Sequence, residues 1–126
     1  MVQSTYELIG GEKTIRKIVN HFYPKVQQHP DLKDLFPEDI TPVMEKQFMF
    51  LSQFFGGPAL YTEQHGHPMM RARHMPFKIN EKRALAWLSC MKEALQEIDL
   101  PPEIQAHLIE RLSGPAFHFI NSDEQE

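Results

Sequence analysis

Residues 66–77, GHPMMRARHMPF, gather side chains that could bind a metal. His74 follows Met70 by four positions, so the two side chains share a face if this segment is helical. Neutral imidazole is the commonest protein ligand for metals, and Pro68 and Pro76 bound the segment that would present it. A lone histidine on a short helix is more often structural or exposed, and that interpretation stays open at this point.

A second histidine pattern, HGH at residues 65–67, lies just before His74. His65, His67 and His74 could together offer three nitrogens to zinc and leave one coordination position open. However, the HGH stretch lacks helical spacing, and such a pattern arises easily by chance in a chain with seven histidines. Zinc binding is therefore a minor alternative.

Three polar-tipped side chains occupy positions where the apolar spacing predicts an interior: Tyr23, Gln47 and Trp87. A buried amide, hydroxyl or indole N–H needs a hydrogen-bond partner. Each residue alone has an ordinary explanation: a glutamine bonded to backbone, a hydroxyl that reaches water, or a core tryptophan. Together they predict a cavity that holds a hydrogen-bonding group.

The elements that must position these residues are helical. Apolar residues recur every three or four positions along almost the whole chain, and no segment shows the two-residue alternation of a strand. We expect an all-α fold of four main helices and some short ones. It forms a single domain over residues 1–126, in which 121–126 are a frayed tail.

Caps and breakers predict the helix boundaries. A short helix is expected at 6–9, a long one from Glu12, and a short one between the two prolines that flank His74. Thr41 and Asn80 are the expected N-caps of two further helices, and the last helix follows Pro101 and Pro102. The stretch from 56 through 65 is expected to be a loop.

Composition excludes several classes of protein. The chain has a net charge of −4 and a pI of about 6.0, unlike the basic surface of a nucleic-acid-binding protein. It has one cysteine, no signal-peptide pattern and no apolar run long enough to span a membrane. We therefore expect a cytoplasmic protein that binds neither nucleic acid nor membrane.

Six motifs occur along the chain in a specific order and spacing. They are IGG at 9–11, FY at 22–23, LFPED at 35–39, QFFGGP at 53–58, YTEQHGHPMMRARHMPF at 61–77 and AWLSCM at 86–91. With these motifs the chain resembles the group II truncated haemoglobins, which are small bacterial globins with a two-over-two helical sandwich. The resemblance covers nearly the whole chain.

The resemblance implies haem b, iron protoporphyrin IX, as the cofactor. The histidine of RARH, His74, would be the proximal iron ligand, its second ring nitrogen donating to the carbonyl of Met70. The opposite axial position would be open to O2 and other diatomic gases. The residues implied as partners of the haem propionates are Lys46, Tyr61 and Arg73. The residues implied as apolar haem walls are Phe36, Phe50, Leu51, Met70 and Phe77.

The resemblance also gives the three polar-tipped residues a role on the distal side. The Tyr23 hydroxyl and the Trp87 indole N–H would donate to bound O2, while Gln47 would hold the tyrosine or the ligand. Such a pocket implies high oxygen affinity and slow release.

The chain departs from the family pattern at some positions. Val43 stands at the distal gate, where the family often has a smaller or polar residue. Phe36 replaces a tyrosine of some members, and position 47 is apolar in others.

Several functions are compatible with these features. The favoured one is a protein that reversibly binds O2 at a five-coordinate iron. An alternative is a haem enzyme that carries out peroxide, O2 or nitric oxide chemistry with an unidentified reductase, and a remote one is a helical module that binds zinc or has no cofactor. A monomer or weak homodimer is expected.

Overall fold

The computed structural model describes residues 3–36, 38–66 and 80–118. Within these ranges the chain is helical, without strands, as the apolar spacing predicts. The helices are α1 (Thr5–Ile9), α2 (Glu12–Gln28), the 3-10 helix η1 (Lys33–Leu35), α3 (Thr41–Phe54), α4 (Leu60–His65), α6 (Glu81–Gln96) and α7 (Pro102–His118).

Among the described helices, α1 and α6 begin at a side-chain cap, Ser4 and Asn80 respectively. The Asn80 side chain accepts a hydrogen bond from the backbone N–H of Arg83 at 2.9 Å, so the predicted cap of α6 is confirmed. Thr41, in contrast, is the first residue of α3 and not its N-cap. The side chain of Asp39 accepts from the Thr41 N–H at 3.1 Å, so an acceptor two residues upstream satisfies this orphan donor instead.

The expected loop at 56–65 is wrong in its second half, where α4 forms. Two side-chain hydrogen bonds join α4 to α3. Gln53 Nε2 donates to Thr62 Oγ1 at 2.8 Å, and the Thr62 N–H donates to Gln53 Oε1 at 3.0 Å. A six-residue helix is marginal on its own, so these contacts with α3, invisible in the local sequence, account for the difference.

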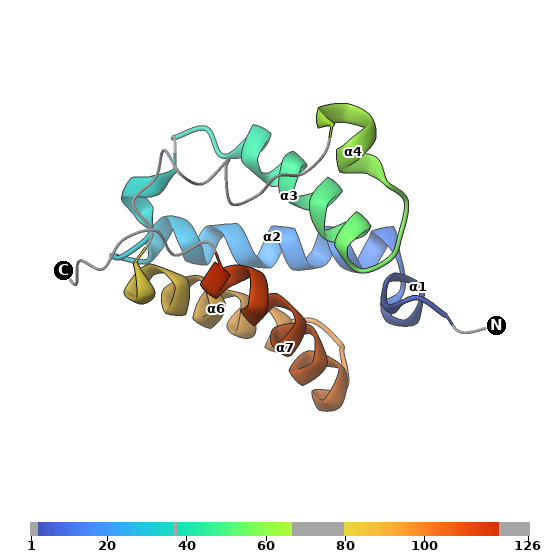
Figure 1. Cartoon of the computed structure of the whole chain (residues 1–126). Helices are drawn as coiled ribbons and strands as arrows, with labels where there is room; N and C mark the ends of the chain where they lie inside the picture. The colour runs from blue at the N-terminus through green and yellow to red at the C-terminus, as the bar shows by residue number, and fades with distance from the viewer. Residues whose placement is uncertain (1–2, 37, 67–79, 119–126) are drawn as a thin grey trace.

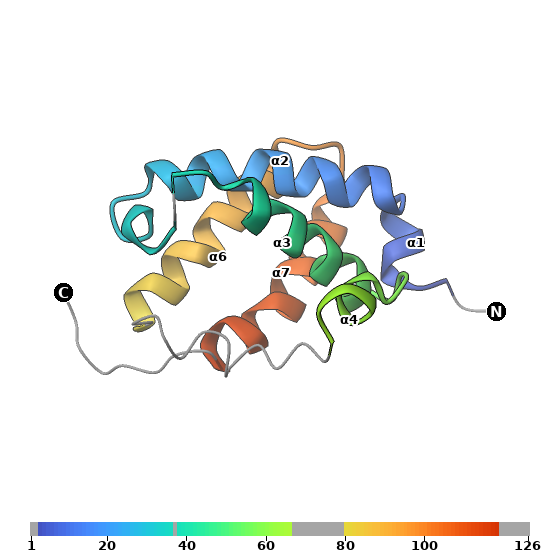
Figure 2. The same cartoon turned by 90° about the horizontal axis from the view of Figure 1, so that it is seen from above.

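The four main helices form two layers. Figure 1 shows α2 crossing the middle of the molecule, with α3 and α4 on one side and α6 and α7 on the other; in Figure 2, seen from above, α2 runs along one edge and α3 crosses in front of α7. Helix α2 packs against both α3 and α6, and α6 packs against α7. The pair α2–α3 therefore lies over the pair α6–α7, which is the expected two-over-two sandwich.

The core lies where α2 meets α3 and α6, and where α6 meets α7. The apolar face predicted for α2 is buried, and its members are Ile15, Ile18, Val19, Phe22 and Val26. Each such side chain contributes roughly 1.5–3 kcal/mol through burial.

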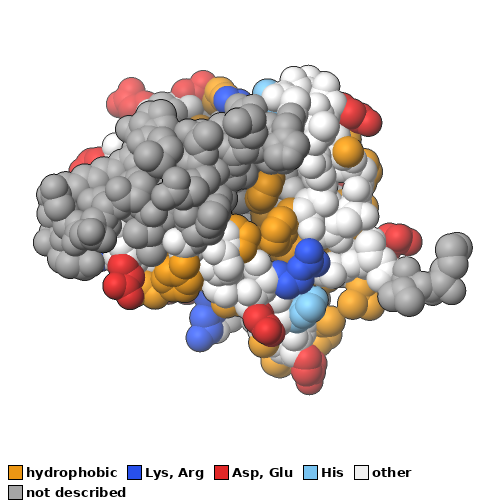
Figure 3. Space-filling model, viewed as in Figure 1, with side chains coloured by type: hydrophobic (Ala, Val, Ile, Leu, Met, Phe, Trp, Pro, Cys, Tyr) orange, Lys and Arg blue, Asp and Glu red, His pale blue; other side chains and the backbone are white. Residues whose placement is uncertain are grey.

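Acidic and basic side chains are interspersed on the described part of the surface that Figure 3 shows. None of the described helices is long and apolar enough to cross a membrane.

Candidate functional site

Tyr23 is a buried phenol whose hydroxyl has no protein partner among the described residues. The residue is 2% exposed, and burial alone raises the pKa of Tyr23 far above its ordinary value. Every fully occluded side-chain nitrogen or oxygen within those residues does have a hydrogen-bond partner. The Tyr23 hydroxyl therefore belongs to the small accessible part of the side chain, where it is a neutral donor available to a ligand.

Trp87 lies on α6 at the edge of the core. The spacing predicts an inward-facing side chain, and the structure shows it half-buried and packed against the core cluster. Its ring lies 5.2 Å from the Phe22 ring, centroid to centroid, at an interplanar angle of 69°. Within the described chain its indole N–H makes no hydrogen bond, so a second donor is available where α6 packs on α2.

Helix α3 presents two apolar rows that differ in burial. Phe48, Leu51 and Phe55 are buried in the core. The neighbouring row is half-buried, and its members are Val43, Gln47, Phe50 and Phe54. Gln47 therefore lies on a face of α3 beside the core, and its amide bonds to no other described residue. The alternative of a core glutamine bonded to backbone does not describe this position.

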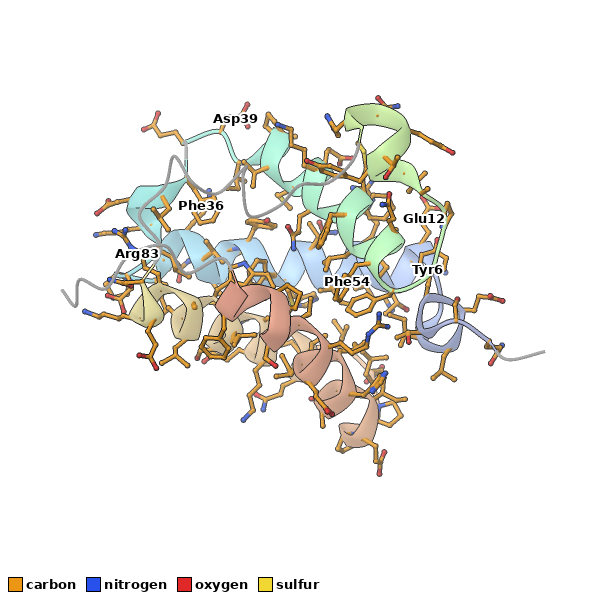
Figure 4. All side chains as sticks on the ribbon, viewed as in Figure 1. Tyr6, Glu12, Phe36, Asp39, Phe54 and Arg83 are labelled. Carbon is orange, nitrogen blue, oxygen red and sulfur yellow. The ribbon has the colours of Figure 1, made fainter. Side chains whose placement is uncertain are left out.

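Aromatic contacts organise the predicted wall residues into two groups. In the first, Phe36 meets the Tyr23 ring edge-on, with centroids 6.1 Å apart. In the second, Phe50 stacks on Phe54 at 5.6 Å and meets Tyr61 edge-on at 6.2 Å. Figure 4 shows Phe36 toward one end of the bundle and Phe54 nearer its middle, so the two groups lie at separate places along it.

The remaining predicted residues have different surroundings. Leu51 is fully buried in the core, and Tyr61 is 3% exposed on α4. Lys46 is exposed on α3, as a partner for a surface carboxylate would be. Val43 is half-buried in the first turn of α3.

His74, the predicted iron ligand, lies outside the described residues. The same holds for three further predicted haem contacts, which are Met70, Arg73 and Phe77, and for His67 of the zinc alternative. His65, at the end of α4, packs its ring 5.0 Å from that of Tyr61. In the described ranges, no cluster of three His, Cys, Asp or Glu residues could hold a metal.

One residue that the sequence did not single out as functional is Phe22. It is fully buried and contacts the rings of both Tyr23 and Trp87. Its place on the apolar face of α2 identified it only as core. The FY pair at 22–23 was the one signal that could have linked it to the polar residues.

The arrangement fits a flat apolar cofactor that carries a small polar ligand. Phe36 and Phe50 supply half-buried aromatic surface. Tyr23, Trp87 and Gln47 supply hydrogen-bonding groups that the described protein leaves available. A helical sandwich with side chains of this kind defines a class of cofactor-binding proteins in which side chains of facing helices hold the cofactor.

Comparisons with known proteins identify the family. The sequence profile of the family described as "Bacterial-like globin" matches residues 4–121. The Group 2 truncated hemoglobin YjbI of Bacillus subtilis is 51% identical over 121 residues, which cover 96% of this chain and 91% of that protein. The chain belongs to this family, and within it to the group II truncated haemoglobins. It is therefore a haem-binding globin, of a family that binds diatomic gases such as O2.

Solved structures agree with this assignment. The crystal structure of the group II truncated haemoglobin from Bacillus anthracis matches with a TM-score of 0.95 and 47% identity, covering 99% of this chain and 96% of that one. The X-ray structure of a "truncated oxygen-avid haemoglobin" from Bacillus subtilis matches with a TM-score of 0.90 and 50% identity, covering 94% of this chain and all of that one.

Proposed function

We propose that this globin binds O2 reversibly and with high affinity on haem b, and that Tyr23, Trp87 and Gln47 hold the bound gas. When bound, haem b would supply the iron that takes the diatomic ligand. The observation that carries the proposal is the buried Tyr23 side chain, whose hydroxyl is its accessible end and bonds to no described residue.

The chemistry of the three side chains favours O2 over less polar gases. Burial keeps the Tyr23 phenol protonated, so it donates and does not repel a partly negative ligand. The Trp87 indole is a donor only, while the Gln47 amide both donates and accepts. Each hydrogen bond to the ligand contributes about 1–2 kcal/mol. The oxygen avidity ascribed to the similar Bacillus subtilis protein supports this assignment.

Other residues of this chain would hold the haem. By the RARH motif, His74 would be the protein ligand of the haem iron, through a neutral imidazole nitrogen. The half-buried rings of Phe36 and Phe50 fit the apolar porphyrin faces. The exposed Lys46 ammonium, with Arg73 and Tyr61, suits the carboxylates at the haem edge.

The test is the rate of O2 release from the haem-loaded protein, measured by stopped flow with CO as the replacing ligand. Tyr23→Phe and Trp87→Phe each remove one donor and keep an aromatic ring. Each variant should release O2 about 5–30-fold faster, since each loses about 1–2 kcal/mol of hydrogen bonding. Release of CO, a weaker hydrogen-bond acceptor, should change much less. If neither variant releases O2 faster than the parent, the hydrogen-bonding account is wrong.

A further inference from the structure

Phe22 links the two donor residues through aromatic contacts. Its ring is completely buried, and it meets Tyr23 at 4.9 Å between centroids with an interplanar angle of 77°. It meets Trp87 at 5.2 Å and 69°. Both are edge-to-face contacts. They place a single phenyl ring between a donor on α2 and a donor on α6.

Edge-to-face packing restricts ring orientation because the positive edge of one ring faces the negative face of the next. Phe22 is held on the buried face of α2 with Ile18, Val19 and Val26, so its ring is a fixed reference. Trp87 is only half-buried, so core packing restricts its tilt less than that of Phe22. Phe36 restricts Tyr23 further, at 6.1 Å and 80°.

We propose that Phe22 is a positioning residue for ligand binding. It sets the tilt of the Trp87 indole and the Tyr23 phenol, so that both donors point at the ligand in the orientation that retains it. Phe22 has no polar atom and makes no hydrogen bond of its own. This role rests on the proposed function, in which Tyr23 and Trp87 are the donors.

The test compares two buried phenylalanines. Phe22→Leu removes the ring that contacts both donors. Phe55→Leu is the matched control, because Phe55 is 2% exposed in the same core but packs on Phe54 and Arg111. Phe22→Leu should speed O2 release about three- to tenfold, while Phe55→Leu should change it less than about twofold.

A second readout reports the orientation of Trp87 directly. Trp87 is the single tryptophan, so a protein labelled with ¹⁵N-tryptophan gives one indole N–H signal in the diamagnetic ferrous CO form. Phe22→Leu should shift and broaden this signal, and Phe55→Leu should leave it in place. Phe22→Met, which keeps most of the buried volume without a ring, should behave like Phe22→Leu and serves if the leucine variant does not fold.

The outcomes separate this proposal from the proposed function. If Phe22→Leu and Phe22→Met leave the indole signal and O2 release as in the parent, Phe22 does not position the donors. Equal changes in the Phe55→Leu control would also overturn the proposal, because general loosening of the core would explain them. If Tyr23→Phe and Trp87→Phe leave O2 release unchanged, the donor function itself fails, whatever the indole signal does.

Discussion

Tyr23 owes its usefulness as a donor to its surroundings. Burial raises its pKa, so the phenol stays neutral near neutral pH and well above it. An ionised phenolate could only accept a hydrogen bond and would repel a ligand with partial negative charge. Because the folded-state pKa is the higher one, this group stabilises the fold below the ordinary tyrosine pKa and loses that effect as the pH rises beyond it.

Cys90 gives a residue-scale prediction that is independent of the haem site. It is 1% exposed, and burial raises the pKa of its thiol to about 11, with Glu93 adding to the shift and Lys25 opposing it. At pH 8 the native protein should therefore react with a thiol reagent at least about a hundredfold more slowly than the unfolded chain. The rate should rise in parallel with unfolding in urea. Labelling of the native protein at the rate of an unfolded thiol would contradict this.

At the scale of elements, α2 and α3 are joined by an ion pair with an aromatic contact beneath it. The Arg16 guanidinium donates to both Glu45 oxygens, at 2.7 and 3.2 Å, and lies 3.8 Å from the centre of the Phe48 ring. Both charged side chains are substantially exposed, so water screens the pair. Arg16 thus stabilises the α2–α3 pair through both the ion pair and the contact with the Phe48 ring, whereas Glu45 contributes only through the ion pair.

This difference predicts unequal effects on the free energy of unfolding. Glu45→Ala should cost about 0.5–1 kcal/mol, and Arg16→Ala about 1–2 kcal/mol because it also loses the contact with Phe48. In the Arg16→Ala background, Glu45→Ala should cost almost nothing. Urea titrations of the four proteins measure this cycle, and additive losses would show that the pair contributes no coupling.

The pH dependence of the same pair has a defined sign. The hydrogen bond from Arg16 is the main cause that lowers the pKa of Glu45. The stabilisation is therefore complete at neutral pH and is lost as the pH falls below the ordinary glutamate range, about 4. Added salt should weaken it at every pH.

The elements also show what the sequence can predict. The four main helices follow from apolar spacing and local caps such as Asn80, because both signals lie within the segment that folds. Helix α4 depends on the two hydrogen bonds between Gln53 and Thr62, nine residues apart, which no local pattern reveals. Tyr23 and Trp87 could be identified from the sequence because each is a polar-tipped residue at a position where the spacing predicts an interior. Phe22 could not, because its contact with Trp87 joins two helices that are far apart in the sequence.

At the scale of the whole molecule, the two proposed donors lie where the two layers meet. Tyr23 comes from the α2–α3 layer and Trp87 from the α6–α7 layer, and α2 and α6 pack directly on each other. A porphyrin against this side buries several hundred Å² of apolar surface. At ~25 cal/mol per Å² this could contribute roughly ten kcal/mol before ordering costs. Haem binding and the stability of the fold should therefore be strongly linked.

The central claim is that this chain holds one haem b through His74. The most direct test is a titration of the purified haem-free protein with haemin, followed by reduction under anaerobic conditions and an absorption spectrum. The account predicts a Soret band that saturates at one haem per chain and a five-coordinate ferrous spectrum. His74→Ala should lose that spectrum, and the control His65→Ala should keep it. A parent protein that stays colourless with haemin, or a His74→Ala variant with an unchanged ferrous spectrum, would contradict the account.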